Sequence, residues 1–215
     1  MTMKAIAFTA PALALASALA LSPVPVRGDD HGAIPRFAVV LDSGAVSVEQ
    51  PGFGSGVRHG GGVFFKTGHR MGIGLVLERY SVPVSLGAAG LLSAGRMTMT
   101  TLLIDEQLYV LTEGRLLPYA LMGIGFAFPV YAPDDWPAGE RRRVFVDRMA
   151  LQVGAGLDVR VSSSLAVCGN ARYNLVKTWM EDEGRTFPIR DVDPLAQNML
   201  HLYGLELSLG IKLAF

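Results

Sequence analysis

The sequence has very little cysteine and no excess of charge of either sign. Cys168 is the only cysteine among 215 residues, so no internal disulfide forms and we expect no metal site around it. Lys+Arg and Asp+Glu each number 19. Loss of Lys4 with a cleaved leader leaves 18 against 19, a net charge of about −1 that argues against a nucleic-acid partner. Charged residues are sparse at 18% while glycines number 25, which suits small interior residues and an apolar exterior.

The first 20 residues have the pattern of a secretory signal peptide. Lys4 supplies a positive start, an apolar run covers 5–16, and Ala18-Leu19-Ala20 is a small-residue cleavage site. The alternative, an uncleaved membrane anchor, is disfavoured because the run is rich in alanine and contains Pro11. We therefore expect residues 1–20 to be cleaved, 21–33 to form a periplasmic N-terminal segment, and 34–215 to form the folded domain.

The stretch from His201 to Phe215 alternates without a break. Alternate side chains of a strand lie on opposite faces, so this pattern predicts a strand with one apolar and one small or polar face. Its length, about 30 Å along the normal at a tilt near 45°, suits a hydrocarbon core. The alternative is an edge strand of a soluble sandwich, which rarely needs so long an apolar face. The apolar positions are Tyr203, Leu205, Leu207, Leu209, Ile211, Leu213 and Phe215.

The segment 116–133 carries no charge and is long enough for a transmembrane helix. Three prolines frame it, however, and Gly123 and Gly125 interrupt it. Its even-numbered residues from Ala120 to Val130 are apolar, whereas the odd-numbered ones are mostly small. A lipid-facing strand is therefore the preferred interpretation and the helix is the alternative.

The whole pattern predicts eight strands joined alternately by short turns and long connections. An even number of strands lets the sheet close and leaves no edge in lipid, and the asymmetry of the connections is typical of transmembrane barrels. The fold class that we predict is therefore all-β, an eight-stranded antiparallel up-and-down transmembrane β-barrel with both ends in the periplasm. The expected strands cover 36–44, 61–67, a segment from 71, 96–110, 116–133, 149–161, 165–175 and 201–215, and the expected long connections cover 47–59, 85–95, 132–147 and 180–198.

Two strands are irregular in the sequence. The strand from Met71 loses its pattern near Arg79 and Pro83, where we expect a bulge. In 96–110 the even-numbered residues read as outward, which turns Glu106 towards lipid. A change of register near Thr100-Thr101 would relieve that conflict.

With eight strands in place, residues 34–215 resemble the small outer-membrane barrels of the OmpA-like transmembrane-domain and OmpX type, with OmpW-like features. The resemblance implies an integral protein of the Gram-negative outer membrane. It also implies that Tyr203 and Phe215 of the last strand form a signal for the barrel-assembly machinery. The motifs that carry it are Pro118-Tyr119 with Gly123-x-Gly125, Gly154-x-Gly156-x-Asp158-x-Arg160, Ala171-Arg172-Tyr173, the last strand and Val192-Asp193-Pro194.

The inward faces of the expected strands carry charges of both signs. An eight-stranded barrel is just wide enough for side chains, and an unpaired charge inside would cost several kcal/mol, so these groups must pair. We expect Asp158 to pair with Arg172, and Glu206 with Arg172 or Arg160. The interior polar network that we predict comprises Asp42, Glu78, Gln152, Asp158, Arg160, Asn170, Arg172, Asn174, Glu206 and Lys212. Cys168 among them is expected to be a small filler.

These features predict a non-catalytic protein with a structural or surface-loop binding role and without a cofactor, metal or catalytic residue set. The first alternative is an OmpW-like channel for small or hydrophobic solutes. The second is a lipid A acyl hydrolase, for which only His59 and His201 are expected near the external rim. His59 lacks the His-x-Ser pair of the deacylases that it would resemble.

The third long connection offers a candidate lipid contact. Arg141, Arg142 and Arg143 could meet phosphates of lipopolysaccharide, because arginine binds phosphate through paired hydrogen bonds. Trp136 and Trp179 are expected to be interfacial anchors. Outer-membrane lipid, and the assembly machinery during insertion, are the other expected partners, and the sequence leaves the oligomeric state open.

Overall fold

The computed structural model describes residues 37–85, 94–134, 148–179 and 199–215, and its regular elements there are all β-strands. The strands are β1 (Phe37–Val48), β2 (Ser55–Lys66), β3 (Met71–Val84), β4 (Gly95–Tyr109), β5 (Leu116–Pro133), β6 (Arg148–Arg160), β7 (Leu165–Trp179), β8 (Met199–His201) and β9 (Gly204–Ala214). The expected signal peptide 1–20 and the segment 21–33 lie outside the described residues.

Leu116–Pro133 forms the single strand β5, so the strand interpretation of that segment is confirmed. In the described ranges there is no helix that combines the length and the apolar character needed to cross a membrane.

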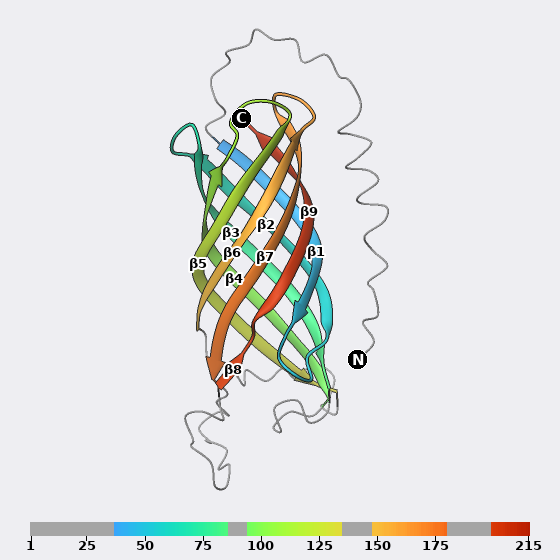
Figure 1. Cartoon of the computed structure of the whole chain (residues 1–215). Helices are drawn as coiled ribbons and strands as arrows, with labels where there is room; N and C mark the ends of the chain where they lie inside the picture. The colour runs from blue at the N-terminus through green and yellow to red at the C-terminus, as the bar shows by residue number, and fades with distance from the viewer. Residues whose placement is uncertain (1–36, 86–93, 135–147, 180–198) are drawn as a thin grey trace.

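The sheet closes on itself (Figure 1). Each strand from β1 to β7 pairs antiparallel with the next, β9 pairs with β7, and β1 pairs with β9. Strands β8 and β9 keep one register on β7, from Lys177 opposite His201 to Asn174 opposite Gly204. They are therefore two pieces of one barrel strand, and the predicted eight-stranded antiparallel barrel is confirmed.

The connections divide the barrel into two ends. The turns 67–70, 110–115 and 161–164, together with Phe215, lie at one end, which we call the turn end. The connection 49–54 lies at the other end, the loop end, together with the strand ends at Val84, Gly95 and Pro133 (Figure 1). The prediction of a long first connection over 47–59 is wrong, because β1 continues to Val48 and β2 begins at Ser55.

The outer surface of the barrel is apolar. Along β3 the exposed residues Ile73, Leu75 and Leu77 alternate with buried Gly74 and Val76. The same alternation runs along β5 and β9, in the phase that the sequence predicts. Large apolar side chains that face outward without a protein partner are what a transmembrane barrel presents to lipid.

Strand β2 is longer than predicted because its glycines are a requirement of packing and not the end of a strand. A Cβ on Gly60 would lie 2.8 Å from Asp42 Oδ1, and a Cβ on Gly62 would lie 2.8 Å from Val76 Cγ2. These glycines leave room for neighbouring side chains in the lumen. The strand therefore runs through the glycine-rich stretch that the sequence presents as a loop.

The two predicted irregularities are placed differently in the structure. Strand β3 pairs regularly with β4 from Met71–Leu108 to Val84–Gly95, so neither a bulge in β3 nor a change of register in β4 occurs. The extra residue lies on the opposite strand. The pair Val57–Ser81 belongs to the β2–β3 ladder, whereas the bridge Phe53–Val84 is displaced from it by one residue.

Glu106 therefore remains on the outward face, three residues from the turn end of β4, and is half-buried.

One residue of β6 also departs from the prediction. Val159, expected to face lipid, is only 7% exposed. Its ladder partners Leu116 and Val167 are large side chains on the same face, and they flank it.

Candidate functional site: the barrel lumen

The lumen of the barrel contains the polar residues that the sequence assigns to its inward face. Nine of the ten are buried: Asp42, Glu78, Gln152, Asp158, Asn170, Arg172, Asn174, Glu206 and Lys212. The tenth, Arg160, is half-buried at the turn end of β6. Cys168 is 1% exposed and packs with the apolar side chains of the lumen.

Arg58 of β2 lies at the centre of the polar residues and is 0% exposed. Its Nη1 donates to Asp42 Oδ1 at 2.8 Å, and its Nη2 donates to Glu78 Oε1. Its Nε lies 3.0 Å from Glu206 Oε2 in an ion pair. The three carboxylates belong to β1, β3 and β9, so one guanidinium connects β2 to three other strands.

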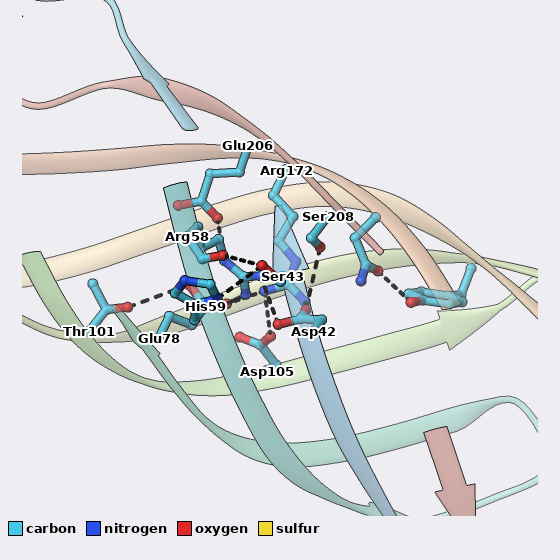
Figure 2. A network of polar contacts seen from close by, with 12 residues as sticks. Asp42, Ser43, Arg58, His59, Glu78, Thr101, Asp105, Arg172, Glu206 and Ser208 are labelled. Carbon is cyan, nitrogen blue, oxygen red and sulfur yellow. Dashed lines mark hydrogen bonds and ion pairs between the residues drawn. The ribbon is translucent and has the colours of Figure 1, made fainter. Parts of the chain in front are cut away.

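Arg172 of β7 is the second buried guanidinium (Figure 2). Its Nη1 donates to Glu78 Oε1, so Glu78 joins the two guanidiniums. Asp42 Oδ2 lies 3.8 Å from Arg172 Nη2, and Asp105 Oδ2 lies 3.9 Å from Arg172 Nη1. Gln152 of β6 completes this side by donating from Nε2 to Asp105 Oδ1 at 2.6 Å.

We call the six residues Asp42, Arg58, Glu78, Asp105, Arg172 and Glu206 the charged cluster. Two hydroxyls add to it, since Thr101 Oγ1 donates to Glu78 Oε2 and Ser208 Oγ donates to Asp42 Oδ2, both at 3.4 Å. The cluster holds four carboxyl groups against two guanidiniums. Both oxygens of Glu206 and Oδ2 of Asp105 have no hydrogen-bond donor among the described residues.

The predicted pair of Asp158 with Arg172 is wrong. Asp158 Oδ2 lies 2.8 Å from Lys212 Nζ, whereas Arg172 belongs to the charged cluster. In the β6–β7 ladder Asp158 stands opposite Cys168, four residues from Arg172, which is about 13 Å along a strand. Glu206 does stand opposite Arg172 in the ladder, but the guanidinium that it approaches is that of Arg58.

Lys212 organises a second polar group near the turn end. Its Nζ donates to Asp158 Oδ2 at 2.8 Å, to Gln107 Oε1 at 3.0 Å and to Tyr109 OH at 2.5 Å. The ammonium also lies 5.6 Å from the ring centre of Phe64. A cation on aromatic faces and carboxylate oxygen is well stabilised without water, so this group holds Lys212 in place.

The loop-end half of the lumen is apolar. It is lined by the buried residues Val46, Val48, Tyr80, Val82, Val84, Met97, Met99, Tyr131, Val176 and Leu202. The lumen therefore has three zones in order along the barrel axis. An apolar zone lies near the loop end, the charged cluster lies in the middle, and the Lys212 group lies nearest the turn end.

Glycines on the inward face leave space that larger side chains fill. A Cβ on Gly123 would lie 2.2 Å from Asp105 Oδ1, and a Cβ on Gly156 would lie 2.3 Å from the Tyr119 ring. Tyr119 uses that space to donate its hydroxyl to Asn170 Oδ1. At the height of the charged cluster the lumen is thus occupied by side chains.

Alternation along the sequence did not assign Arg58 and Asp105 to the lumen, although both are fully buried in the charged cluster. Arg58 lies in a stretch that reads as a loop because of its glycines. Asp105 lies in the strand whose phase the sequence left in doubt. The available signal was the pair Leu102 and Ile104 on β4, since an outward face at even numbers turns Asp105 inward.

The remaining predicted sites fall on other parts of the chain. Phe215 is 70% exposed at the turn end, and Tyr203 is half-buried between β8 and β9. His59 faces outward on β2, and Ser43 Oγ lies 2.9 Å from its Nδ1. Outside the described residues lie the arginines 141–143, Trp136 and Val192-Asp193-Pro194, as do the side chains of His201 and Trp179. In the described ranges no three His, Cys, Asp or Glu side chains are grouped so that they could hold a metal ion.

Comparison with solved structures identifies the fold. The outer membrane protein OprG from Pseudomonas aeruginosa matches with a TM-score of 0.60 at 15% identity, over 87% of this chain and 99% of that one. The chain has the fold of the small eight-stranded outer-membrane β-barrels. Neisserial surface protein A matches with a TM-score of 0.59 at 15% identity, covering 83% and 97%. A major outer membrane protein from Thermus thermophilus gives 0.53 at 12%, covering 83% and 99%.

No protein-family model and no curated protein sequence matches the chain. At such identities the likeness concerns the fold alone. What this small outer-membrane barrel does must therefore be argued from its own residues.

Proposed function

We propose that this barrel is a non-catalytic integral protein of the Gram-negative outer membrane with a structural or surface-loop binding role, whose lumen is closed by the charged cluster. The observation that carries the proposal is Arg58, which is fully buried at mid-lumen and bound to carboxylates of three other strands. A buried ion pair that loses one partner costs several kcal/mol, so these contacts resist opening.

The closure draws on almost the whole wall. Counting Gln152, the cluster takes side chains from β1, β2, β3, β4, β6, β7 and β9, and β5 contributes Gly123, whose missing side chain leaves room for Asp105 and Gln152. Such a layer fixes strand register and also denies water a continuous path.

Conductance in a planar lipid bilayer tests the closure. The full chain is expected to give no steady single-channel current, because ions would have to displace the charged cluster. The double variant Glu78→Ala with Arg172→Ala should conduct, since it removes the carboxylate that joins both guanidiniums and one of the guanidiniums. Thr98→Ala, which changes an outward side chain of β4, is the matched control. A steady current from the unmodified barrel would refute the closed lumen.

A channel for small or hydrophobic solutes is the second candidate. The apolar loop-end half of the lumen favours it, because Val82, Met97 and Met99 would accept an apolar solute. Passage would then require the ion pairs below to exchange partners. Uptake of an apolar dye into vesicles that contain the barrel distinguishes the solute channel from the closed barrel. Dye uptake without ionic current supports the channel, and the absence of both uptake and current rules it out.

Hydrolysis of lipid A acyl chains is the third candidate. The contact between Ser43 and His59 supplies a serine beside a histidine on the outward face. A hydrolytic triad also needs a carboxylate that orients the histidine, and within the described ranges no carboxylate binds His59. We expect unchanged lipid A masses from cells that overproduce the protein.

The proposed location implies three further partners. Outer-membrane lipid would surround the apolar belt, and the barrel-assembly machinery would recognise the last strand with Tyr203 and Phe215. Lipopolysaccharide would meet Arg141, Arg142 and Arg143. Export would use a signal peptide that is cleaved after residue 20, which N-terminal sequencing of the mature protein can check.

A further inference from the structure

We propose that a groove on the outward face of β2, β3 and β4 binds the phosphate groups of an outer-leaflet lipid headgroup. The inference rests on the proposed outer-membrane location. The groove has a volume of about 440 Å³ and is lined by Ser55, His59, Arg79, Ser81, Pro83 and Arg96 among others. We call it the arginine groove. It lies on the lipid side of the wall and is separate from the charged cluster in the lumen.

The groove lies where the apolar belt ends. One cross-strand row of outward residues runs Leu41, Gly61, Leu77 and Leu102, and it carries no polar side chain. The next row towards the loop end runs Ser43, His59, Arg79 and Thr100, and each of its side chains is polar. A change from apolar to polar side chains between one row and the next marks the boundary between hydrocarbon and headgroups.

The height of the two arginines agrees with that boundary. Arg79 lies eight residues from Met71 along β3 in the direction of the loop end. At a strand tilt near 40° this is about 20 Å along the membrane normal. Arg96 pairs with Pro83, which is four residues beyond Arg79 on β3. Arg96 therefore lies about 10 Å further along the normal than Arg79. The apolar band of such barrels is about 25 Å tall. With the band taken to begin at Met71, the first residue of β3, Arg79 lies just inside its far boundary and Arg96 just outside it.

Neither arginine has an anionic partner among the described residues. Both are exposed, and no carboxylate in the described ranges forms an ion pair with Arg79 or Arg96. The buried guanidiniums of Arg58 and Arg172, by contrast, are each bound to carboxylates. An arginine that faces lipid needs an anion from its surroundings, and a guanidinium pairs with phosphate through two hydrogen bonds.

The displaced register of β2 helps to form the groove. Between the pair Val57–Ser81 and the bridge Phe53–Val84 the ladder gains one residue on the β2 side, so the register shifts beside Pro83 while the Gly54 N–H still donates to the Pro83 carbonyl at 2.9 Å. Pro83 has no N–H to donate, which suits an interrupted ladder. Ser55 and Ser81 add hydroxyl groups to the lining. The site therefore combines a recess, hydroxyls and two cations that have no anionic partner in the part of the chain that the structure describes.

The occupant that fits is a lipid with two phosphate groups, as in lipid A. Arg79 and Arg96 are separated by four steps of the β3–β4 ladder, about 13 Å, so two phosphates can bind the two guanidiniums at once. Below Arg79 the exposed Leu75 and Leu77 offer an apolar wall for acyl chains. A free phosphate ion would gain nothing from that wall.

Native mass spectrometry of the full-length barrel in detergent micelles, titrated with purified lipid A, tests the proposal. The unmodified barrel should bind bisphosphoryl lipid A more tightly than the monophosphoryl form, and inorganic phosphate at millimolar concentration should not compete. The double variant Arg79→Gln with Arg96→Gln should weaken binding at least about tenfold, because it removes both charged contacts. The matched control is Arg70→Gln, an exposed cation at the turn end, which should leave binding unchanged.

A second variant separates this groove from the loop. The triple variant of Arg141, Arg142 and Arg143 to Gln measures how much of the lipid A binding comes from the loop, and it should lose less binding than the groove variant. If the triple variant loses binding and the groove variant keeps it, or if the unmodified barrel shows no preference for the bisphosphoryl form, the proposal is overturned. A steady current from the same preparation would refute only the closed lumen, so the two failures are distinguishable.

Discussion

Arg58 shows how much one residue contributes inside this barrel. It is the fully buried partner of Asp42, Glu78 and Glu206, and its charge is balanced only because they surround it. The four carboxyl groups of the cluster outnumber the two guanidiniums. Removing a cation and removing an anion should therefore have unequal effects.

We expect Arg58→Gln to lower the free energy of unfolding by about 3–5 kcal/mol, because Glu206 loses its ion-pair partner while Asp42 and Glu78 keep only Arg172. Glu206→Gln should lower it by less, since the four carboxyl groups outnumber the two guanidiniums and the glutamine carbonyl can still accept from Arg58 Nε. Urea unfolding of each variant in lipid vesicles measures the difference. Equal losses in the two variants would contradict the unequal balance of charge.

At the scale of single residues, the sequence predicted which side chains face inward but not which of them meet. Alternation assigns Asp158, Arg172 and Lys212 to the same face, because the strand period is 2. It does not give their heights, which depend on the register of each ladder. Lys212 reaches Asp158 across the lumen from a strand 54 residues away in sequence, a contact that no local pattern contains.

Neighbouring strands fit together where a large side chain on one strand lies over a glycine on the next. Phe64 of β2 lies over Gly74 of β3, where a Cβ would come within 2.4–2.7 Å of three ring atoms. Gly72, two residues earlier on the same face, has only the Phe65 carbonyl oxygen at 3.8 Å. The two positions look alike in sequence and differ in the structure.

Gly74→Ala should therefore destabilise the barrel by about 1–3 kcal/mol through overpacking, whereas the matched variant Gly72→Ala should be nearly neutral. Phe64→Leu in the Gly74→Ala background should recover part of the loss, which a double-mutant cycle measured by urea unfolding would show as a coupling energy. A cost for Gly72→Ala as large as that for Gly74→Ala would show that the ring contact is not the cause.

At this scale the prediction was best for the strands with a clean period, β5, β6, β7 and β9. It was wrong at β2, where glycines that serve packing read as a loop. It was also wrong at the bulge, which lies opposite β3 and not within it. A pattern in one strand cannot show an irregularity that belongs to its neighbour.

The whole molecule depends on closure between its first and last strands. β9 pairs with β1 from Ala38–Ala214 to Val48–Gly204. Phe215 follows the last ladder pair, its N–H donates to the Phe37 carbonyl at 2.8 Å, and its ring centre lies 6.0 Å from that of Phe37. With most of its surface exposed, Phe215 adds little to the packing of the finished barrel.

Deletion of Phe215 should accordingly reduce assembly in cells several-fold while leaving folding in detergent nearly unchanged, if the last strand is the signal that the resemblance implies. The fraction of protein that migrates differently on SDS gels with and without boiling measures folded barrel in both settings. Phe65→Ala is the matched control, because Phe65 is also exposed and contacts Phe37 at 5.3 Å between ring centres. Equal losses in cells and in detergent would assign Phe215 a packing role instead.

The sequence by itself determined that this chain is a barrel and which face of most strands meets lipid. Both follow from period-2 alternation and strand length, which are local properties of the chain. Only the tertiary structure decided that Arg58 and Asp105 join the charged cluster, that Asp158 binds Lys212, and that Arg79 and Arg96 share one groove. Those contacts are set by ladder register and by the closed wall, which bring side chains of distant strands to the same height and to the same side.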